Sequence, residues 1–331
     1  MKSKNMSKFL MDNILYICLL LMIVIIAVIS PSFISVRVLS DVLIQSAPKI
    51  LLAMGMLVVI IAGGMDMTVG RLAGLGAVVS GTLAQQATYY IKFWPSLPEL
   101  PLIVPVVVSI LVGMISGFIT GVIISKLRVP AFLAGLGLQL IIYGGTLLFM
   151  KKAPNNSQPL AGYRTDFTTF GTGSVLGINY LIIVAIVVMV VVFVILNKTT
   201  LGKNIYATGG NREAAKVAGI NVFKIDMFVY ILSGALAALA GCMLAARTGS
   251  ANAGYAEGYE MDAIASCIIG GASFTGGIGN VPGALLGVII FSVISYGLTF
   301  VGLSSYWQNI VKGLIIIVSV ALDMRKYASD K

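Results

Sequence analysis

The stretch YATGGNREAAKVAGINVF, residues 206–223, is a polar segment in a chain that is otherwise apolar. Of the 331 residues, 58% are hydrophobic and only 10% are charged, yet Arg212 and Glu213 stand side by side here. Asn211 is a residue type that caps helix starts, Glu213 would lie in the first turn, and Gly219 is typical of a helix end. The segment therefore predicts a short polar helix of about two turns.

Apolar runs dominate the rest of the chain. A helix needs roughly 17–25 apolar residues to cross the hydrocarbon core of a bilayer. Clear runs cover residues 14–29, 102–124, 131–150, 180–196, 227–246, 281–301 and 306–322, and less regular ones cover 42–62, 72–90 and 261–276. We therefore predict an all-α, polytopic integral membrane protein of about ten transmembrane helices, with residues 1–331 forming one domain.

The net charge of +10 is explained by membrane topology and does not require nucleic-acid binding. With the N-terminus inside, the predicted inner segments hold about twice as many lysines and arginines as the outer ones, as the positive-inside rule demands. In this assignment Arg71 is in an inner segment, Lys49 is in an outer one, and Lys312 is within the last span. Both termini are then cytoplasmic, and the longest inner loop, residues 197–226, contains the polar helix.

Catalytic chemistry has few candidates in this sequence. The chain has no histidine, which excludes Ser-His and Cys-His nucleophile pairs and histidine metal sites. It has no G-x-x-x-x-G-K-[ST] loop, so we expect no ATPase site of its own. Cys18, Cys242 and Cys267 lie in apolar runs without paired or metal-ligand spacing, as expected of packing thiols. We expect no catalytic residue, no metal and no cofactor.

Two glycine-rich stretches repeat one another. GGMDMTVGRLAGLG from Gly63 and GGASFTGGIGNVPG from Gly270 share glycine at positions one, two, eight and fourteen and threonine at position six. Glycines within spans permit broken helices, whose exposed backbone is tolerated only where it is buried in protein or lines a cavity. Transporters often place such breaks around the substrate path. Close helix packing is an equally good explanation of the glycines.

Polar side chains at equivalent or neighbouring positions of these motifs are candidates for a translocation path. They are Asp66, Thr68, Ser273 and Thr275. For Asp66, capping of the following helix and exposure to a cavity are both open. Glu260 and Asp262 begin a predicted span near the outer interface, where capping or loop pairing is as good an explanation as substrate contact.

Two further features concern contacts. Gly113, Gly117 and Gly121 are four residues apart on one predicted helix face, which favours close helix packing within or between subunits. Several cations lie in predicted outer segments despite the positive-inside rule, among them Arg164 and Arg247. Docking of an acidic partner and simple solvation or lipid contact both explain these two arginines.

The polar helix and the glycine motifs together carry a family resemblance. The pattern E-A-A-x-x-x-G, from Glu213 to Gly219, resembles the coupling-helix signature of ABC-importer permeases. GGMDMTVG resembles the first glycine-rich break of the ribose-type monosaccharide permeases, although Met67 and Thr68 stand where leucine and serine are more usual. IGGASFTGGIGNVPGALLG is similar to their second break. The stretch VISYGLTFVGLSSYWQNIVKGLIIIVSVALDMRKY is closest to the galactose/methyl-galactoside branch.

This resemblance implies a permease subunit of a sugar importer in a bacterial inner membrane. Two copies would form the path, and a periplasmic or lipoprotein sugar-binding protein would deliver a monosaccharide. A cytoplasmic ABC ATPase would dock on residues 211–219. The matching positions of that helix are Asn211, Glu213, Ala214, Ala215 and Gly219. The alternatives are an ion-coupled secondary sugar transporter, for which the spans offer few ionisable groups, and a membrane-embedded enzyme, for which they offer no nucleophile–base pair.

Overall fold

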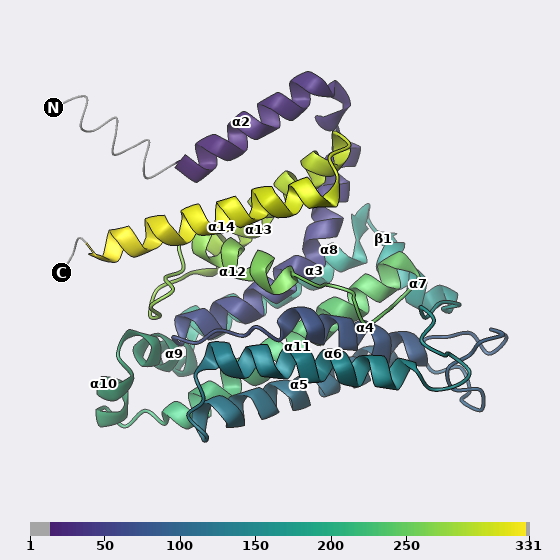
Figure 1. The fold of residues 1–331 in the computed structure, drawn as a ribbon, viewed down its shortest axis with the longest axis horizontal. Coiled ribbons are helices and arrows are strands. Elements are labelled where there is room, and N and C mark those ends of the chain that lie inside the picture. Colours follow the sequence, from purple (N-terminus) through teal and green to yellow (C-terminus); the bar gives the residue numbers. More distant parts are fainter. Residues whose placement is uncertain (1–13, 329–331) are drawn as a thin grey trace.

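The computed structural model of this chain describes residues 14–328. Within them, helices dominate, and the two strands named pair as a short hairpin (Figure 1). The elements are α2 (Ile14–Ile29), η1 (Pro31–Phe33), α3 (Val36–Ile61), α4 (Val69–Leu83), α5 (Ile103–Ser125), α6 (Ala131–Met150), α7 (Thr165–Thr172), β1 (Ser174–Val175), β2 (Ile178–Asn179), α8 (Tyr180–Lys198), α9 (Thr200–Gly210), α10 (Arg212–Val217), α11 (Val222–Thr248), α12 (Tyr259–Ile269), α13 (Val281–Phe300) and α14 (Ser305–Ala328). The mostly helical architecture agrees with the predicted all-α class.

Six helices of the described chain are long and apolar enough to cross a membrane: α3, α5, α6, α8, α11 and α13. The sequence predicts about ten spans, and three of the remaining candidates, α2, α4 and α12, are shorter helices. With 15 residues, α4 rises only about 22 Å, and α12 with 11 residues about 16 Å, against a hydrocarbon core of about 30 Å. The count of ten therefore stays a prediction.

Both short helices adjoin a glycine-rich turn. The chain leaves α3 at Ile61 and enters α4 only at Val69, and it leaves α12 at Ile269 and enters α13 at Val281. The intervening residues are turns that include several glycines with positive φ. The expected run 261–276 therefore holds only part of a helix, because glycine, which lacks Cβ, allows the chain to turn there.

Helix α11 lies at the centre of the bundle, packed against α3, α4 and α5. A methyl group added at Gly113 or Gly117 of α5 would overlap the backbone of α11 at Gly234 or Tyr230. The two helices therefore approach backbone to backbone, which only glycine permits. The predicted close packing through this glycine face is confirmed, and it occurs within the chain.

The two ends of the molecule are formed by different elements. Figure 1 shows α9 and α10 at one end, together with the start of α2 and the end of α14, and α7 with the hairpin at the opposite end. At the α7 end, backbone pairing of Leu160 with Ala251 and of Gln85 with Tyr163 joins loops that are far apart in the sequence. The elements that carry the candidate site are at the α10 end.

Candidate functional site

Helix α10 has the boundaries that its sequence predicts. The side chain of Asn211 accepts a hydrogen bond of 2.9 Å from the N–H of Ala214, which caps the first turn. At the other end Gly219 has φ +83°, and the N–H of Ile220 returns to the carbonyl oxygen of Ala215 across 3.0 Å. This is the Schellman arrangement, in which a left-handed glycine ends a helix. The short helix is confirmed, and its coupling role stays a prediction.

The helix is attached on one side and open on the other. Arg212 forms an ion pair with Asp226, a buried residue near the start of α11. Lys216 donates a hydrogen bond of 2.6 Å to Glu213, and this bond and the lysine charge lower the pKa of the Glu213 carboxyl. Val217, on the last turn, is 91% exposed. An apolar side chain at the tip of a polar helix is therefore available for contact with another protein.

The repeat in the sequence has a structural counterpart. We name residues 62–68 the first glycine turn and residues 270–280 the second glycine turn. The second residue of each is a left-handed glycine, Gly63 (φ +80°) and Gly271 (φ +87°). In both, the N–H of the following residue returns to the carbonyl five residues earlier across 2.9 Å. The two turns therefore end their preceding helices in the same way.

Side chains repeat the similarity further along the two turns. Asp66 accepts a hydrogen bond from the N–H of Thr68 (3.0 Å), and Ser273 accepts one from the N–H of Thr275 (3.3 Å). Each threonine hydroxyl also lies within hydrogen-bond distance of the same partner, at 2.5 Å and 2.9 Å. The second carboxylate oxygen of Asp66 accepts a bond of 2.7 Å from the hydroxyl of Ser233 on α11. Asp66 thus orders its own turn, and the capping alternative is wrong, since Thr68 holds the N-cap position of α4.

The four proposed path residues differ in exposure. Asp66, Thr68 and Ser273 are fully buried, whereas Thr275 is exposed. The structure unites the residues of each pair within one turn. It also places the two turns together, because the N–H of Gly277 donates a hydrogen bond of 2.9 Å to the carbonyl oxygen of Ile61. A role in translocation stays a prediction for all four.

Charged side chains also pair between neighbouring helices. Asp262 in the first turn of α12 lies 2.9 Å from the Nζ atom of Lys312 on α14 and 3.5 Å from that of Lys49 on α3. Pairing explains Asp262 without a capping role. The assignment of Lys49 to an outer segment is wrong, because this residue lies within an apolar helix that is long enough to span. Three helices are therefore held by one buried carboxylate.

A second charged group lies near the start of α4. Arg71 donates a hydrogen bond of 2.7 Å to Glu257 and stacks over the Tyr143 ring, 4.2 Å from its centroid. Glu257 lies in the loop that follows Arg247, which the sequence analysis assigns to an outer segment, so this pairing contradicts the inner assignment of Arg71. One Glu260 carboxylate oxygen and one terminal Arg71 nitrogen are buried without a hydrogen-bond partner among the described residues.

A cavity of about 750 Å³ lies between α10 and the first glycine turn. This volume is within the range of about 300–1,000 Å³ that small-molecule sites occupy. Its polar and glycine lining residues are Gly63, Gly64, Ser125, Arg128, Arg212, Glu213, Lys216, Asp226 and Tyr230. The coupling-helix candidate and the first glycine turn therefore line the same cavity.

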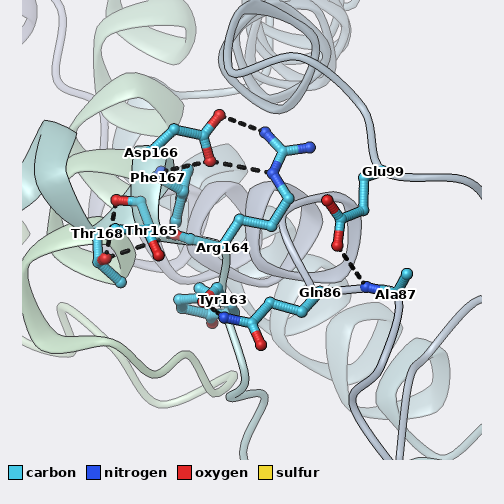
Figure 2. A network of polar contacts seen from close by, with 9 residues as sticks. All are labelled: Gln86, Ala87, Glu99, Tyr163, Arg164, Thr165, Asp166, Phe167 and Thr168. Carbon is cyan, nitrogen blue, oxygen red and sulfur yellow. Dashed lines mark hydrogen bonds and ion pairs between the residues drawn. The ribbon is translucent and has the colours of Figure 1, made fainter.

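The two candidate docking arginines are not free surface cations. Arg164 is 8% exposed. Two of its guanidinium nitrogens donate hydrogen bonds of 3.0 Å and 2.5 Å to the two carboxylate oxygens of Asp166 (Figure 2). Hydrogen bonds from Arg164 lower the pKa of Asp166. Arg247 is half-buried in the last turn of α11. Their role in docking stays a prediction.

Sequence reasoning missed Ser233 and Asp226. Both are polar residues in the apolar helix α11, and both are buried with a partner from a distant segment. A search for polar residues within apolar runs identifies such positions, since polar groups at membrane depth require partners. Their partners, Asp66 and Arg212, depend on the tertiary fold and leave no local signal.

The helices and the cavity define a polytopic membrane protein with a short polar helix at one end. Residues 38–320 match the family described as branched-chain amino acid transport system / permease component, and the chain belongs to this permease family. It is 41% identical to the galactose/methyl galactoside import permease protein MglC of Escherichia coli (strain K12), with 100% of this chain and 99% of the relative aligned. It is 37% identical to the ribose import permease protein RbsC of Bacillus subtilis (strain 168), over 95% and 92% of the two chains. No solved structure matches the chain. The resemblance to permeases is confirmed.

Proposed function

We propose that this chain is the membrane permease subunit of an ABC importer for a monosaccharide, either galactose or a methyl galactoside. The observation that carries the proposal is the alignment of the entire chain with a permease named for the import of these sugars. A relative named for ribose import is less similar, at 36% identity for the Escherichia coli protein. The ATPase activity would belong to a separate cytoplasmic subunit.

The docking element for that ATPase would be residues 211–219 of the inner loop 197–226, which contain α10 and its caps. The residues assigned to this docking element are the two end residues and three residues within the helix: Asn211, Glu213, Ala214, Ala215 and Gly219. Support comes from its exposed position and from Val217, whose apolar side chain is 91% exposed. The helix is capped at both ends and is therefore ordered before binding. Little conformational entropy is lost when such a helix inserts into a groove of a partner.

The path would run past the two glycine turns toward the cavity beside α10. Asp66, Thr68, Ser273 and Thr275 are assigned to it because they occupy equivalent positions of the two turns. The proximity of the turns and the adjoining 750 Å³ cavity support this assignment. Hydroxyl groups and a carboxylate suit transient hydrogen bonds to a neutral sugar. The six long apolar helices, the short helices α4 and α12, and the terminal helices α2 and α14 together would make about ten spans.

The orientation would place α10 in the cytoplasm of a bacterium. Figure 1 places the start of α2 and the end of α14 at the α10 end, in agreement with both termini being cytoplasmic. The opposite end, with Arg164 and Arg247, would receive a periplasmic or lipoprotein sugar-binding protein. A second copy of the chain would complete the path as a homodimer.

Co-purification from native membranes tests the proposal. An affinity-tagged chain, extracted in mild detergent, should carry an ATPase subunit and a sugar-binding protein in the presence of ATP analogue and galactose. Mass spectrometry would identify both, and two differently tagged copies would reveal a homodimer. Recovery of the chain without any ATPase subunit, while a tagged ribose permease treated in parallel retains its own, would contradict the proposal.

A further inference from the structure

A contact between three backbone segments lies directly before the coupling-helix candidate. Gly209 is the penultimate residue of α9, and Asn211, two residues later, caps α10. A methyl group added at Gly209 would overlap the carbonyl oxygen of Ile61, the last residue of α3, and would lie 2.7 Å from the N–H nitrogen of Gly277. A methyl group added at Gly63 would lie 3.6 Å from the Cα atom of Gly209, so Gly209 contacts the first glycine turn as well as the second.

The point of contact is itself a hydrogen bond between the second glycine turn and the end of the helix that precedes the first. The carbonyl of Ile61 belongs to the last turn of α3 and has no partner within that helix. It accepts the 2.9 Å bond from Gly277, so the second glycine turn closes the end of the helix that leads into the first. Gly276 is as close, because a methyl group there would lie 2.8 Å from the Gly209 carbonyl oxygen and 2.8 Å from the Cα atom of Gly63.

A side chain of α9 strengthens the connection. The hydroxyl of Tyr206 donates a hydrogen bond of 2.8 Å to the carbonyl oxygen of Gly279 in the second glycine turn. Tyr206 precedes Gly209 by three residues and lies on the same side of α9. Helix α9 is thus held to the second turn at two successive points, one through a side chain and one through the backbone.

We propose that Gly209 is a positioning residue that transmits displacement of α10 to both glycine turns. This inference rests on the proposed function and names the route of its coupling. Packed backbones without intervening side chains have few alternative arrangements, so a displaced α9–α10 unit displaces Ile61 and Gly277 together. The contact at Gly209 then links the segment that binds the ATPase to both glycine turns, so the two turns move together.

Adjacent glycines of α9 provide a matched test. Gly209→Ala introduces a methyl group that overlaps Ile61, whereas the methyl group of Gly210→Ala meets nothing within 4 Å. Both changes raise helix propensity equally. Each variant is assembled with its ATPase and binding protein in proteoliposomes, and ATP-driven uptake of radiolabelled galactose is measured beside ATP hydrolysis. We expect Gly209→Ala to lower uptake per ATP hydrolysed by about tenfold, within the usual range of coupling between sites, and Gly210→Ala to match the wild type.

Tyr206→Phe is the second variant, because it removes one hydrogen bond and adds no atom. It should lower uptake per ATP in the same direction as Gly209→Ala. If Gly209→Ala does not reach the membrane, Tyr206→Phe decides. Normal uptake per ATP in Tyr206→Phe or in a well-inserted Gly209→Ala overturns the proposed route. Wild-type proteoliposomes without ATP-driven uptake would instead overturn the proposed function.

A structural readout separates transmission from general damage. Thr275 lies in the second glycine turn and is exposed. In a chain whose three native cysteines are replaced by alanine, Thr275→Cys should react with a water-soluble maleimide at different rates in the nucleotide-free and vanadate-trapped complexes. Gly209→Ala should abolish this difference and Gly210→Ala should preserve it. Preservation of the difference in Gly209→Ala would contradict the proposal.

Discussion

Ser233 donates a hydrogen bond of 2.7 Å to the carboxylate of Asp66, which joins the first glycine turn to the central helix α11. Both residues are buried, and the remaining carboxylate oxygen is bonded to the N–H and hydroxyl of Thr68. The turn therefore depends on a single side chain that accepts bonds from two segments. This arrangement explains how an irregular stretch of chain is tolerated among apolar helices, since its polar groups are satisfied internally.

Removal of Asp66 should destabilise the protein more than removal of Ser233. Asp66→Ala leaves three buried donors without partners, whereas Ser233→Ala leaves one oxygen of a carboxylate unpaired. Each unsatisfied buried group costs about 1–3 kcal/mol. Thermal unfolding of the detergent-solubilised protein, followed by size-exclusion fluorescence, should give the lowest Tm for Asp66→Ala. Equal Tm values for Asp66→Ala and the wild type would contradict the network.

The buried group of Asp262 with Lys49 and Lys312 gives a second stability prediction. Asp262→Asn leaves two partly buried lysines without a counter-charge. Breaking a fully buried ion pair costs about 3–5 kcal/mol, which is the upper limit for this group. Replacing Lys49 by Met in the same chain should recover part of that loss, since one uncompensated charge is removed. The measurement is again the Tm in detergent. A double variant less stable than Asp262→Asn alone would show that Lys49 contributes mainly through other contacts.

The sequence predicts α10 and the glycine face of α5 correctly because both depend on local patterns. Caps such as Asn211 and Gly219 act on neighbouring residues, and a four-residue spacing fixes a helix face. Arg71 is assigned wrongly because hydropathy assumes that every apolar run crosses the whole membrane. Lys49 is assigned wrongly because its charge favours an outer segment, although it lies within the apolar run 42–62. The glycine turns interrupt the apolar runs, and the two partners of Arg71, Tyr143 and Glu257, come from distant parts of the sequence. Such contacts arise only from the tertiary fold.

The end of α10 allows a conformational test of coupling. Gly219 has φ +83°, and a side chain there would meet nothing within 4 Å. Gly219→Val should therefore lower coupling through backbone strain of about 1–2 kcal/mol, without a steric clash. Asparagine tolerates the left-handed conformation, so Gly219→Asn serves as the control. The expected result is normal membrane insertion, with substrate-stimulated ATP hydrolysis and uptake both reduced in Gly219→Val only. Normal stimulation in Gly219→Val would remove this helix end from the coupling element.

The pair of Arg164 and Asp166 predicts a pH dependence. Because the folded-state pKa of Asp166 is lowered from 3.8, its contribution to stability is present above that value. The contribution is lost as the pH falls through the lower folded-state pKa. The Tm difference between the wild type and Asp166→Asn should be constant from about pH 5 to pH 8 and should shrink below about pH 4. A difference that grows on acidification would contradict the assigned pairing.

ATP-driven uptake by the reconstituted complex tests the central claim most directly. The chain, its ATPase and its sugar-binding protein are placed in proteoliposomes with ATP available to the ATPase, and radiolabelled galactose uptake is measured with ionophores that collapse every ion gradient. An ABC permease predicts uptake that requires ATP and the binding protein and is unaffected by the ionophores. Uptake that persists without ATP and disappears when the ion gradients collapse would contradict the account and identify an ion-coupled transporter.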